Sequence, residues 1–247
     1  MDKVMVVTGG GRGIGAACAR LGAAQGYRVC VNYARNRAAA DALVAQISVA
    51  GGRALAVQAD VADPAQVRRM FETVDSALGT VTALVNNAGI SGALKPVEDI
   101  DRANLDAVFG VNVYGLFWCC AQAVRRMSTR HGGRGGAIVN VGSIAARTGG
   151  MHGMLAYASS KAAVDAFTLG LAKEVGREGI RVNCLRPGTT RTDIVAPLGE
   201  NLLAQVAAAT PLGRLGESEE IAHAILWLLS DQASYVHGAI HDVSGGR

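Results

Sequence analysis

Short apolar runs alternate with longer amphipathic stretches along the whole chain. Seven of these runs are rich in aliphatic residues and are continuously apolar, as in strands that are covered on both faces. Strands are therefore predicted at residues 5–7, 28–31, 54–57, 84–85, 137–141, 181–185 and 240–243. The amphipathic stretches predict helices near residues 13–26, 37–50, 64–78, 101–129, 155–177 and 217–230.

The alternation of strands and helices predicts an α/β fold, a doubly wound Rossmann-type parallel sheet of about seven strands flanked by helices. Asp63 before Pro64 predicts a helix N-cap, and Ser218 is expected to begin the last helix. No repeat or linker divides the chain, so one domain is expected over residues 1–247.

One segment of the chain departs from this regular pattern. Residues 187–216 lack a clear strand and carry only a weak helical pattern over residues 197–208. Long irregular segments of this kind often close over a bound ligand. We expect a mobile substrate lid here.

Composition narrows the class of protein without naming a function. Half of the 247 residues are hydrophobic, 32 are glycine and 18% are charged, which is typical of a compact globular protein. The net charge of +4 comes without a dense Lys/Arg run, so a nucleic-acid partner is not expected. The five cysteines show no C-x-x-C spacing and predict reduced core thiols, with no metal site.

The N-terminal residues and the length of the apolar runs bear on the expected cellular location. Residues 1–4 lead directly into the first strand, so no signal peptide is expected. No apolar run is judged long enough to cross a membrane. A cytoplasmic protein with no membrane partner is the expectation.

A glycine-rich turn joins the first strand to the first helix, with the sequence Thr8-Gly9-Gly10-Gly11-Arg12-Gly13-Ile14-Gly15. Glycines allow backbone amides to approach a pyrophosphate, and the N-terminus of the following helix favours an anion. The turn therefore predicts a dinucleotide site, with contacts from Gly9, Gly11, Arg12, Gly13 and Ile14.

The end of the second strand bears on the choice of cofactor. An NAD site usually places a carboxylate there for the ribose 2′-hydroxyl, whereas arginine suits a 2′-phosphate. No acid occurs before Asp41, while Arg12, Arg35 and also Arg37 are candidates for the phosphate. NADP(H) is predicted as the preferred cofactor, with NAD(H) and solvated arginines as the alternatives.

A tyrosine and a lysine four residues apart suggest proton chemistry. On a helix, this spacing puts Tyr157 and Lys161 on one face. Lowering a tyrosine pKa from about 10 to about 7 needs roughly 4 kcal/mol. One positive charge ~4–5 Å away supplies ~3–4 kcal/mol at an effective dielectric near 20, but about 1 in water. The pair therefore implies a partly closed cleft, where Lys161 lowers the Tyr157 pKa.

Ser143 follows the apolar strand at residues 137–142 and so emerges at the carboxyl edge of the sheet, where open α/β folds bind ligands. Its hydroxyl can donate a hydrogen bond to a carbonyl oxygen. Tyr157 can exchange a proton with that same oxygen.

These motifs together resemble the short-chain dehydrogenase/reductase family over essentially the whole chain, including its ketoacyl-(acyl-carrier-protein) reductase and glucose dehydrogenase members. The glycine turn, Ser143 and the Tyr157/Lys161 pair carry the resemblance. Further matches are Asp60-Val61, Asn86-Asn87-Ala88-Gly89, Asn112-Val113, Pro187-Gly188, Thr190, Thr192 and Val243-Ser244-Gly245-Gly246.

The resemblance implies roles for several residues. Asn112 would interrupt its helix and help a water link Lys161 to solvent, which makes Asn112, Ser143, Tyr157 and Lys161 the catalytic set. Lys161 would also hold the nicotinamide ribose. The remaining cofactor contacts implied by the family are Asp60 and Val61 at the adenine, Asn87, Ala88 and Gly89 at the adenosine ribose, and Pro187, Gly188, Thr190 and Thr192 near the nicotinamide.

The expected reaction interconverts a ketone and a secondary alcohol, with the cofactor carrying the hydride. A β-ketoacyl thioester, a sugar or polyol, and a small xenobiotic carbonyl remain open as substrates. The segment from Ser143 to Tyr157 is slightly longer than in fatty-acid-type reductases, and its His152 is expected to face solvent. A catalytically silent dinucleotide-binding or scaffold protein is the competing class.

Two surfaces suggest partners. The implied assembly is a homotetramer, for which the helices at 101–129 and 155–177 offer apolar surface. A basic cluster near one helix end would suit an acidic acyl-carrier protein, but a basic helix C-terminus that complements its dipole explains it better. The cluster consists of Arg125, Arg126, Arg130, Arg134 and Lys173.

Overall fold

The computed structural model describes residues 3–193, 195 and 198–247. Its seven strands form one sheet in the order β3-β2-β1-β4-β5-β6-β7, and every neighbouring pair is parallel. The predicted doubly wound α/β fold is therefore confirmed. The strands are β1 (Lys3–Val7), β2 (Tyr27–Tyr33), β3 (Arg53–Gln58), β4 (Ala83–Asn86), β5 (Gly136–Val141), β6 (Ile180–Pro187) and β7 (Ile240–Val243).

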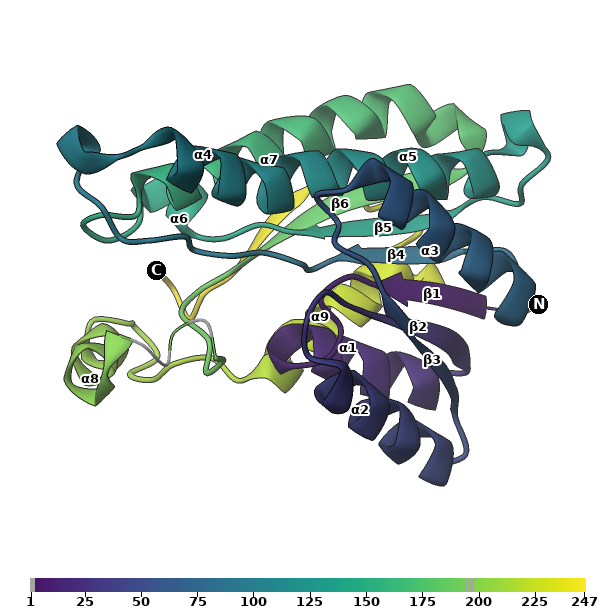
Figure 1. The fold of residues 1–247 in the computed structure, drawn as a ribbon, viewed down its shortest axis with the longest axis horizontal. Helices are drawn as coiled ribbons and strands as arrows, with labels where there is room; N and C mark the ends of the chain where they lie inside the picture. Colours follow the sequence, from purple (N-terminus) through teal and green to yellow (C-terminus); the bar gives the residue numbers. More distant parts are fainter. Residues whose placement is uncertain (1–2, 194, 196–197) are drawn as a thin grey trace.

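Helices cover both faces of the sheet. Figure 1 shows α1, α2 and α9 on one face and α3, α4, α5 and α7 on the other. The strand order reverses between β1 and β4, and the carboxyl ends that meet there form the edge where such sheets bind ligands. The helices are α1 (Gly13–Ala24), α2 (Arg37–Val49), α3 (Pro64–Ala77), α4 (Arg102–Phe109), α5 (Gly115–Met127), α6 (Ala145–Thr148), α7 (Leu155–Val175), α8 (Glu200–Ala208) and α9 (Ser218–Leu229).

Two apolar clusters lie on either side of the sheet. Met5 and Ile225 belong to the cluster under α1 and α9, and Phe71 and Ile138 belong to the one under α3 and α5. Successive strand residues point to opposite faces, so each central strand feeds both clusters. All five cysteines are buried free thiols, as predicted.

Both predicted helix starts are observed, with different capping groups. The Asp63 carboxylate caps α3 by accepting a hydrogen bond from the Ala65 amide at 2.8 Å, which confirms the prediction. Ser218 is the first residue of α9 and not its cap. Glu217 and Glu220 cap the helix through a reciprocal capping box.

The helix predicted over residues 101–129 is divided. It consists of α4, a π-helical segment over Gly110–Tyr114, and α5. Taken together, Arg102–Met127 is long and apolar enough to cross a membrane, so the expectation about apolar runs is wrong for this stretch. Half of its most apolar window is buried inside the protein, because this helix supplies one wall of the core.

The predicted lid contains a short helix and is anchored at its base. Thr190 forms a β-bridge with Gly216, and the Arg191 amide donates to the Gly216 carbonyl at 2.9 Å. The weak helical pattern corresponds to α8, which Figure 1 shows apart from the sheet and near the C-terminus. Positions 194, 196 and 197 lie outside the described residues, and the mobility of the lid stays a prediction.

Candidate active site

Buried polar side chains hold the glycine turn on the sheet. The Gly9 amide donates to Oδ1 of Asn32 at 3.1 Å, and Nδ2 of Asn87 donates to the Gly9 carbonyl at 3.0 Å. The Thr8 hydroxyl accepts from the Ala88 amide at 3.0 Å. The turn is thereby fixed to both β2 and β4. Sequence reasoning named Thr8 only as part of the glycine motif and gave Asn32 no role, although a polar residue within an apolar strand, as at Asn32, is a signal for such a role.

The shape of the turn fits a pyrophosphate. Gly9 and Gly13 have φ of 60° and 52°, a region that favours glycine. A Cβ on Gly9 would lie 3.0 Å from Cα of Ala88, and one on Gly15 would lie 2.5 Å from the Gly9 carbonyl oxygen. Arg12 stands at the N-cap of α1 without a capping side-chain bond, and no acid lies in the first turn. The helix N-terminus is therefore open to an anion.

One candidate arginine, Arg12, stands in this turn, and a second, Arg35, follows the neighbouring strand β2. Arg12 is exposed and pairs with Asp193 at the start of the lid segment, at 3.2 Å. Arg35 is exposed directly beyond β2. Arg37 instead begins α2 and pairs with Asp41 one turn later on the same helix, at 3.2 Å. The edge beside β2 is therefore basic, which suits a 2′-phosphate.

The remaining adenosine-side candidates occupy the rim of the site. The Asp60 carboxylate is exposed and accepts from the Ala62 amide at 3.0 Å, and Val61 is buried beside the end of β4. At Gly11, by contrast with Gly9, a Cβ would meet Ala40 at ordinary contact distance, 3.6 Å.

The predicted catalytic hydroxyls and the lysine open onto one pocket. Ser143 follows β5, and Tyr157 and Lys161 lie one turn apart on α7. The pocket has a volume of about 620 Å³. It is also lined by the four residues predicted near the nicotinamide, Pro187, Gly188, Thr190 and Thr192, and by Ile14, Asn87 and Gly89 from the other predicted cofactor contacts.

Ser143 is oriented by the helix that follows it. Its Oγ accepts a hydrogen bond from the Ala145 amide at 3.1 Å, at the start of the short helix α6, which sequence reasoning missed. Because the amide uses a lone pair of the hydroxyl oxygen, the O–H remains free to donate. Ser143 is thus placed as a hydrogen-bond donor toward the pocket.

Lys161 is buried, and its ammonium has one hydrogen bond in the described structure, to the Val141 carbonyl at 2.8 Å. Its Nζ lies 5.8 Å from the centre of the Tyr157 ring. Burial lowers the pKa of Lys161 to about 8, while Cys184 and Asp165 oppose that shift.

The pKa of Tyr157 corrects one prediction. Burial of the phenol raises its pKa above the usual value of 10, and only hydrogen bonding to Ser143 acts in the opposite direction. Lys161 was expected to lower this pKa. In the chain alone, desolvation is the larger effect, so Tyr157 is held as a protonated phenol.

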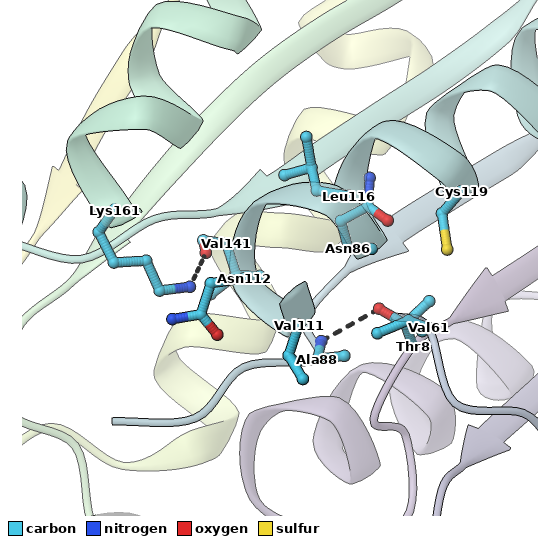
Figure 2. Close-up of a pocket in the computed structure, with 11 residues that line it drawn as sticks. Thr8, Val61, Asn86, Ala88, Val111, Asn112, Leu116, Cys119, Val141 and Lys161 are labelled. Carbon is cyan, nitrogen blue, oxygen red and sulfur yellow. Dashed lines mark hydrogen bonds between the residues drawn. The ribbon is translucent and has the colours of Figure 1, made fainter. Parts of the chain in front are cut away.

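Asn112 lies in the π-helical segment, so its helix is interrupted at the predicted position. Its Oδ1 accepts from the Ile90 amide at 2.9 Å, and its Nδ2 donates to Ser160 Oγ at 2.9 Å. Figure 2 shows Asn112 and Lys161 pointing toward each other beside Val141, at a cavity of about 10 Å³. That size is at the lower limit for holding one water.

The outer walls of the pocket are largely apolar, with Ser91, Thr148, Thr189 and Arg247 as their polar members. Glycines with positive φ at Gly149, Gly150 and Gly153 bend the segment that carries two of these wall residues, while His152 is exposed. No acidic side chain lines the pocket within the described part of the chain. The principal wall residues are Leu94, Ile144, Met151, Met154, Val195 and Leu198.

The basic cluster is partly neutralised by its own neighbours. Arg126 pairs with Asp75 at 2.8 Å, and Arg130 pairs with Glu178 at 3.3 Å. Arg126 lies in the last turn of α5 and Arg130 follows that helix, in agreement with the helix-dipole explanation. Over the described ranges, no group of three or more His, Cys, Asp or Glu side chains is arranged to hold a metal ion.

Comparison with known proteins agrees with this geometry. A family model described as enoyl-(acyl carrier protein) reductase matches residues 9–247. An uncharacterised oxidoreductase of Escherichia coli, YgfF, is 47% identical over 245 residues, covering 99% of both chains. The 3-oxoacyl-[acyl-carrier-protein] reductase FabG of Staphylococcus aureus is 36% identical, covering 100% of this chain and 98% of its own. The chain belongs to the short-chain dehydrogenase/reductase family, a family of oxidoreductases.

Solved structures show the same relationship. A blue fluorescent protein from a metagenomic library, in complex with NADPH, has a TM-score of 0.91 and 38% identity, covering 99% of this chain and 97% of its own. A short-chain dehydrogenase from Burkholderia cenocepacia in complex with NADP has a TM-score of 0.91 and 36% identity, with the same coverage. Both of these relatives bind the phosphorylated dinucleotide.

Proposed function

We propose that this protein is an NADP(H)-dependent oxidoreductase that interconverts ketones and secondary alcohols, with Tyr157 as the general acid/base. The observation that carries the proposal is the shared pocket. Ser143, Tyr157 and Lys161 line the same cavity as Ile14, which follows the glycines of the turn, and Pro187-Gly188. A proton donor and a site for a hydride carrier therefore meet at one sheet edge.

The residues divide the chemistry in the following way. The bound dinucleotide supplies or accepts the hydride. Ser143 donates a hydrogen bond to the substrate oxygen, and Tyr157 donates its phenolic proton to that oxygen during reduction. The raised pKa of Tyr157 favours this direction at neutral pH, because the phenol holds its proton until the oxygen becomes basic. Lys161 stabilises the resulting phenolate and binds the nicotinamide ribose. Asn112 and the small cavity beside it would hold the water that connects Lys161 to solvent.

NADP(H) is the proposed cofactor because the edge beside β2 is basic. Arg12 and Arg35 are both exposed there, and the first acid, Asp41, lies on α2 and is paired with Arg37. The NADPH- and NADP-bound relatives support the same choice. Measuring kcat/KM with NADPH and with NADH tests it, and a preference for NADH would contradict it.

The pocket walls favour a substrate with an apolar body. Leu94, Met151, Met154 and Leu198 offer hydrophobic contact, while the polar side chains outside the predicted catalytic and cofactor residues are few: Ser91, Thr148, Thr189 and Arg247. A ketoacyl or aryl ketone therefore fits better than a sugar, and the similarity to FabG supports the ketoacyl class. The basic cluster gives an acyl-carrier protein no independent support, since Arg126 and Arg130 are paired.

The experiment is a substrate panel read by NADPH absorbance. It contains an acetoacetyl thioester, aryl ketones, a keto-sugar and the corresponding alcohols. We expect turnover of the thioester or the ketones, with little turnover of the sugar. Binding of NADPH without turnover of any member would favour the silent dinucleotide-binding protein instead.

We also propose a homotetramer in the cytoplasm. Several large apolar side chains are exposed on the helix layer formed by α4, the π-helical segment, α5 and α7, and they suit a helix-to-helix interface. They are Leu105, Tyr114, Phe117, Trp118 and Leu169. Light scattering distinguishes a tetramer from a dimer.

A further inference from the structure

A buried ion pair lies directly behind the catalytic residues. Asp165 on α7 accepts two hydrogen bonds from Arg186 on β6, from Nη2 at 2.7 Å and from Nε at 3.1 Å. The two side chains are 9% and 17% exposed. A two-bond guanidinium–carboxylate pair in such a place has a fixed geometry. Neither residue belongs to the catalytic set or the cofactor site described above.

The helix brings this carboxylate to the same strand end as the catalytic lysine. Asp165 lies one turn after Lys161 on α7. Lys161 Nζ bonds the carbonyl of Val141, and a Cβ placed on the next residue, Gly142, would lie 3.5 Å from Asp165 Oδ1. Gly142 immediately precedes Ser143. The lysine bonds Val141 and the aspartate approaches the next residue, Gly142, at the base of the catalytic site.

The groups around Lys161 leave Asp165 as its counter-charge. Tyr157 faces it from α7 and Cys184 from β6, and burial raises the pKa of both, that of Cys184 to about 12. The phenol and the thiol are therefore neutral near pH 7. A Cys184 thiolate would favour the charged form of Lys161, but the thiolate forms only at high pH. Asn112 contributes a neutral amide from the π-helical segment.

Arg186 in turn is balanced by a second carboxylate. Its Nη1 lies 3.5 Å from Oδ1 of Asp242 on β7, and Oδ2 of Asp242 lies 3.3 Å from Nε of Arg147 on α6. The ion pair is thus one end of a charged chain that runs from beside Lys161 to the helix that orients Ser143. Arg186 is anchored from both sides and cannot move toward the lysine without breaking these contacts.

We propose that Asp165 and Arg186 are positioning residues. Asp165 supplies the buried negative charge that keeps Lys161 a cation. Arg186 holds that carboxylate in place and weakens its electrostatic effect on Lys161. The inference rests on the proposed function for the role of Lys161 in the reaction. Its electrostatic content concerns the chain alone and can be measured without turnover.

The test measures the titration of Lys161 in the cofactor-free protein. The chain has four lysines, so a sample labelled with ¹³C-lysine gives a simple NMR spectrum, and Lys161→Met assigns the signal. Removing the negative charge in D165N should lower the pH at which Lys161 titrates. Removing the positive charge in R186M should raise it. We expect each shift to be about 0.5 pH unit or more, because a single charge a few ångströms away in a buried site changes a pKa by more than that amount.

Two further variants keep the outcome decisive. R186K retains the positive charge and should bring the titration midpoint of Lys161 back toward the native value. If D165N does not fold, the comparison of R186M with R186K still tests the proposal. R126M breaks the Arg126–Asp75 pair far from the site and should leave the Lys161 titration unchanged. The alkaline limb of kcat/KM should move with the NMR midpoint in each variant.

Opposite shifts in D165N and R186M support the proposal. Unchanged midpoints, or shifts of the same sign in both variants, overturn it and leave the pair a structural contact only. An inactive protein with opposite NMR shifts would contradict the proposed function and not this inference.

Discussion

The ammonium group of Lys161 donates its hydrogen bond to the main-chain carbonyl of Val141, at 2.8 Å, and lies 5.8 Å from the centre of the Tyr157 ring. The lysine is therefore held by the sheet and not by the tyrosine. Its charge remains available in the pocket, but at an energetic cost, because burial opposes it.

Replacing this lysine should stabilise the fold while abolishing activity. The pKa of Lys161 falls from 10.5 to about 8, which corresponds to a cost of about 3 kcal/mol to the folded state at neutral pH. Loss of the bond to Val141 offsets about 1 kcal/mol of this. We expect Lys161→Met to raise the free energy of unfolding by about 1–3 kcal/mol at pH 7, as measured by urea denaturation.

The pH dependence of that gain has a definite sign. Between about pH 8 and pH 10.5, the unfolded lysine binds a proton that the folded lysine has lost, so the native protein gains stability relative to Lys161→Met as pH rises. The advantage of the variant should be complete below pH 8 and gone above pH 10.5. An advantage that grows with pH would contradict the assignment.

Tyr157→Phe tests the proton donor. The phenylalanine keeps the ring and removes only the hydroxyl, so kcat for ketone reduction should fall by about 10²–10⁴. The affinity for NADPH, followed by fluorescence titration, should change by less than about threefold. Near-native turnover would refute the mechanism.

Arg35→Ser tests the 2′-phosphate contact. Loss of a charge-assisted hydrogen bond of about 1.5–3 kcal/mol should lower kcat/KM for NADPH by about 10–100-fold. The value for NADH should hardly change, because NADH lacks the phosphate. Arg37→Ser is the matched control, since Arg37 pairs with Asp41 on α2. Equal losses with both cofactors would place Arg35 outside the phosphate site.

Gly9→Ala tests the close approach in the glycine turn. Gly9 has φ of 60°, and its new Cβ would lie 3.0 Å from Cα of Ala88, so strain and a clash combine. We expect loss of NADPH binding by more than tenfold and destabilisation of about 1–3 kcal/mol. Gly26→Ala is the control, because Gly26 has φ of 86° with open space around it. It should lower stability only, with NADPH binding intact.

The sequence predicted the features that depend on local pattern. The positions of the buried strands, the glycine turn and the shared helix face of Tyr157 and Lys161 all follow from the spacing of residues along the sequence. The features it missed depend on tertiary surroundings. The short helix after Ser143 is too local for periodicity to detect, and the helix interruption at Asn112 follows from the family resemblance and not from periodicity. The raised pKa of Tyr157 depends on how completely the pocket excludes water. The Asp165–Arg186 pair joins residues 21 positions apart, and only packing of α7 on β6 brings them together.

Apart from Ile144, the principal apolar pocket walls come from three segments outside the sheet: the stretch near Leu94, the turn carrying Met151 and Met154, and the lid residues Val195 and Leu198. The proton-transferring groups, by contrast, are fixed to β5 and α7. Selection on these three segments can therefore alter which carbonyl compounds are accepted without disturbing the reacting atoms. A library that varies only these five side chains is the economical route to a changed substrate range.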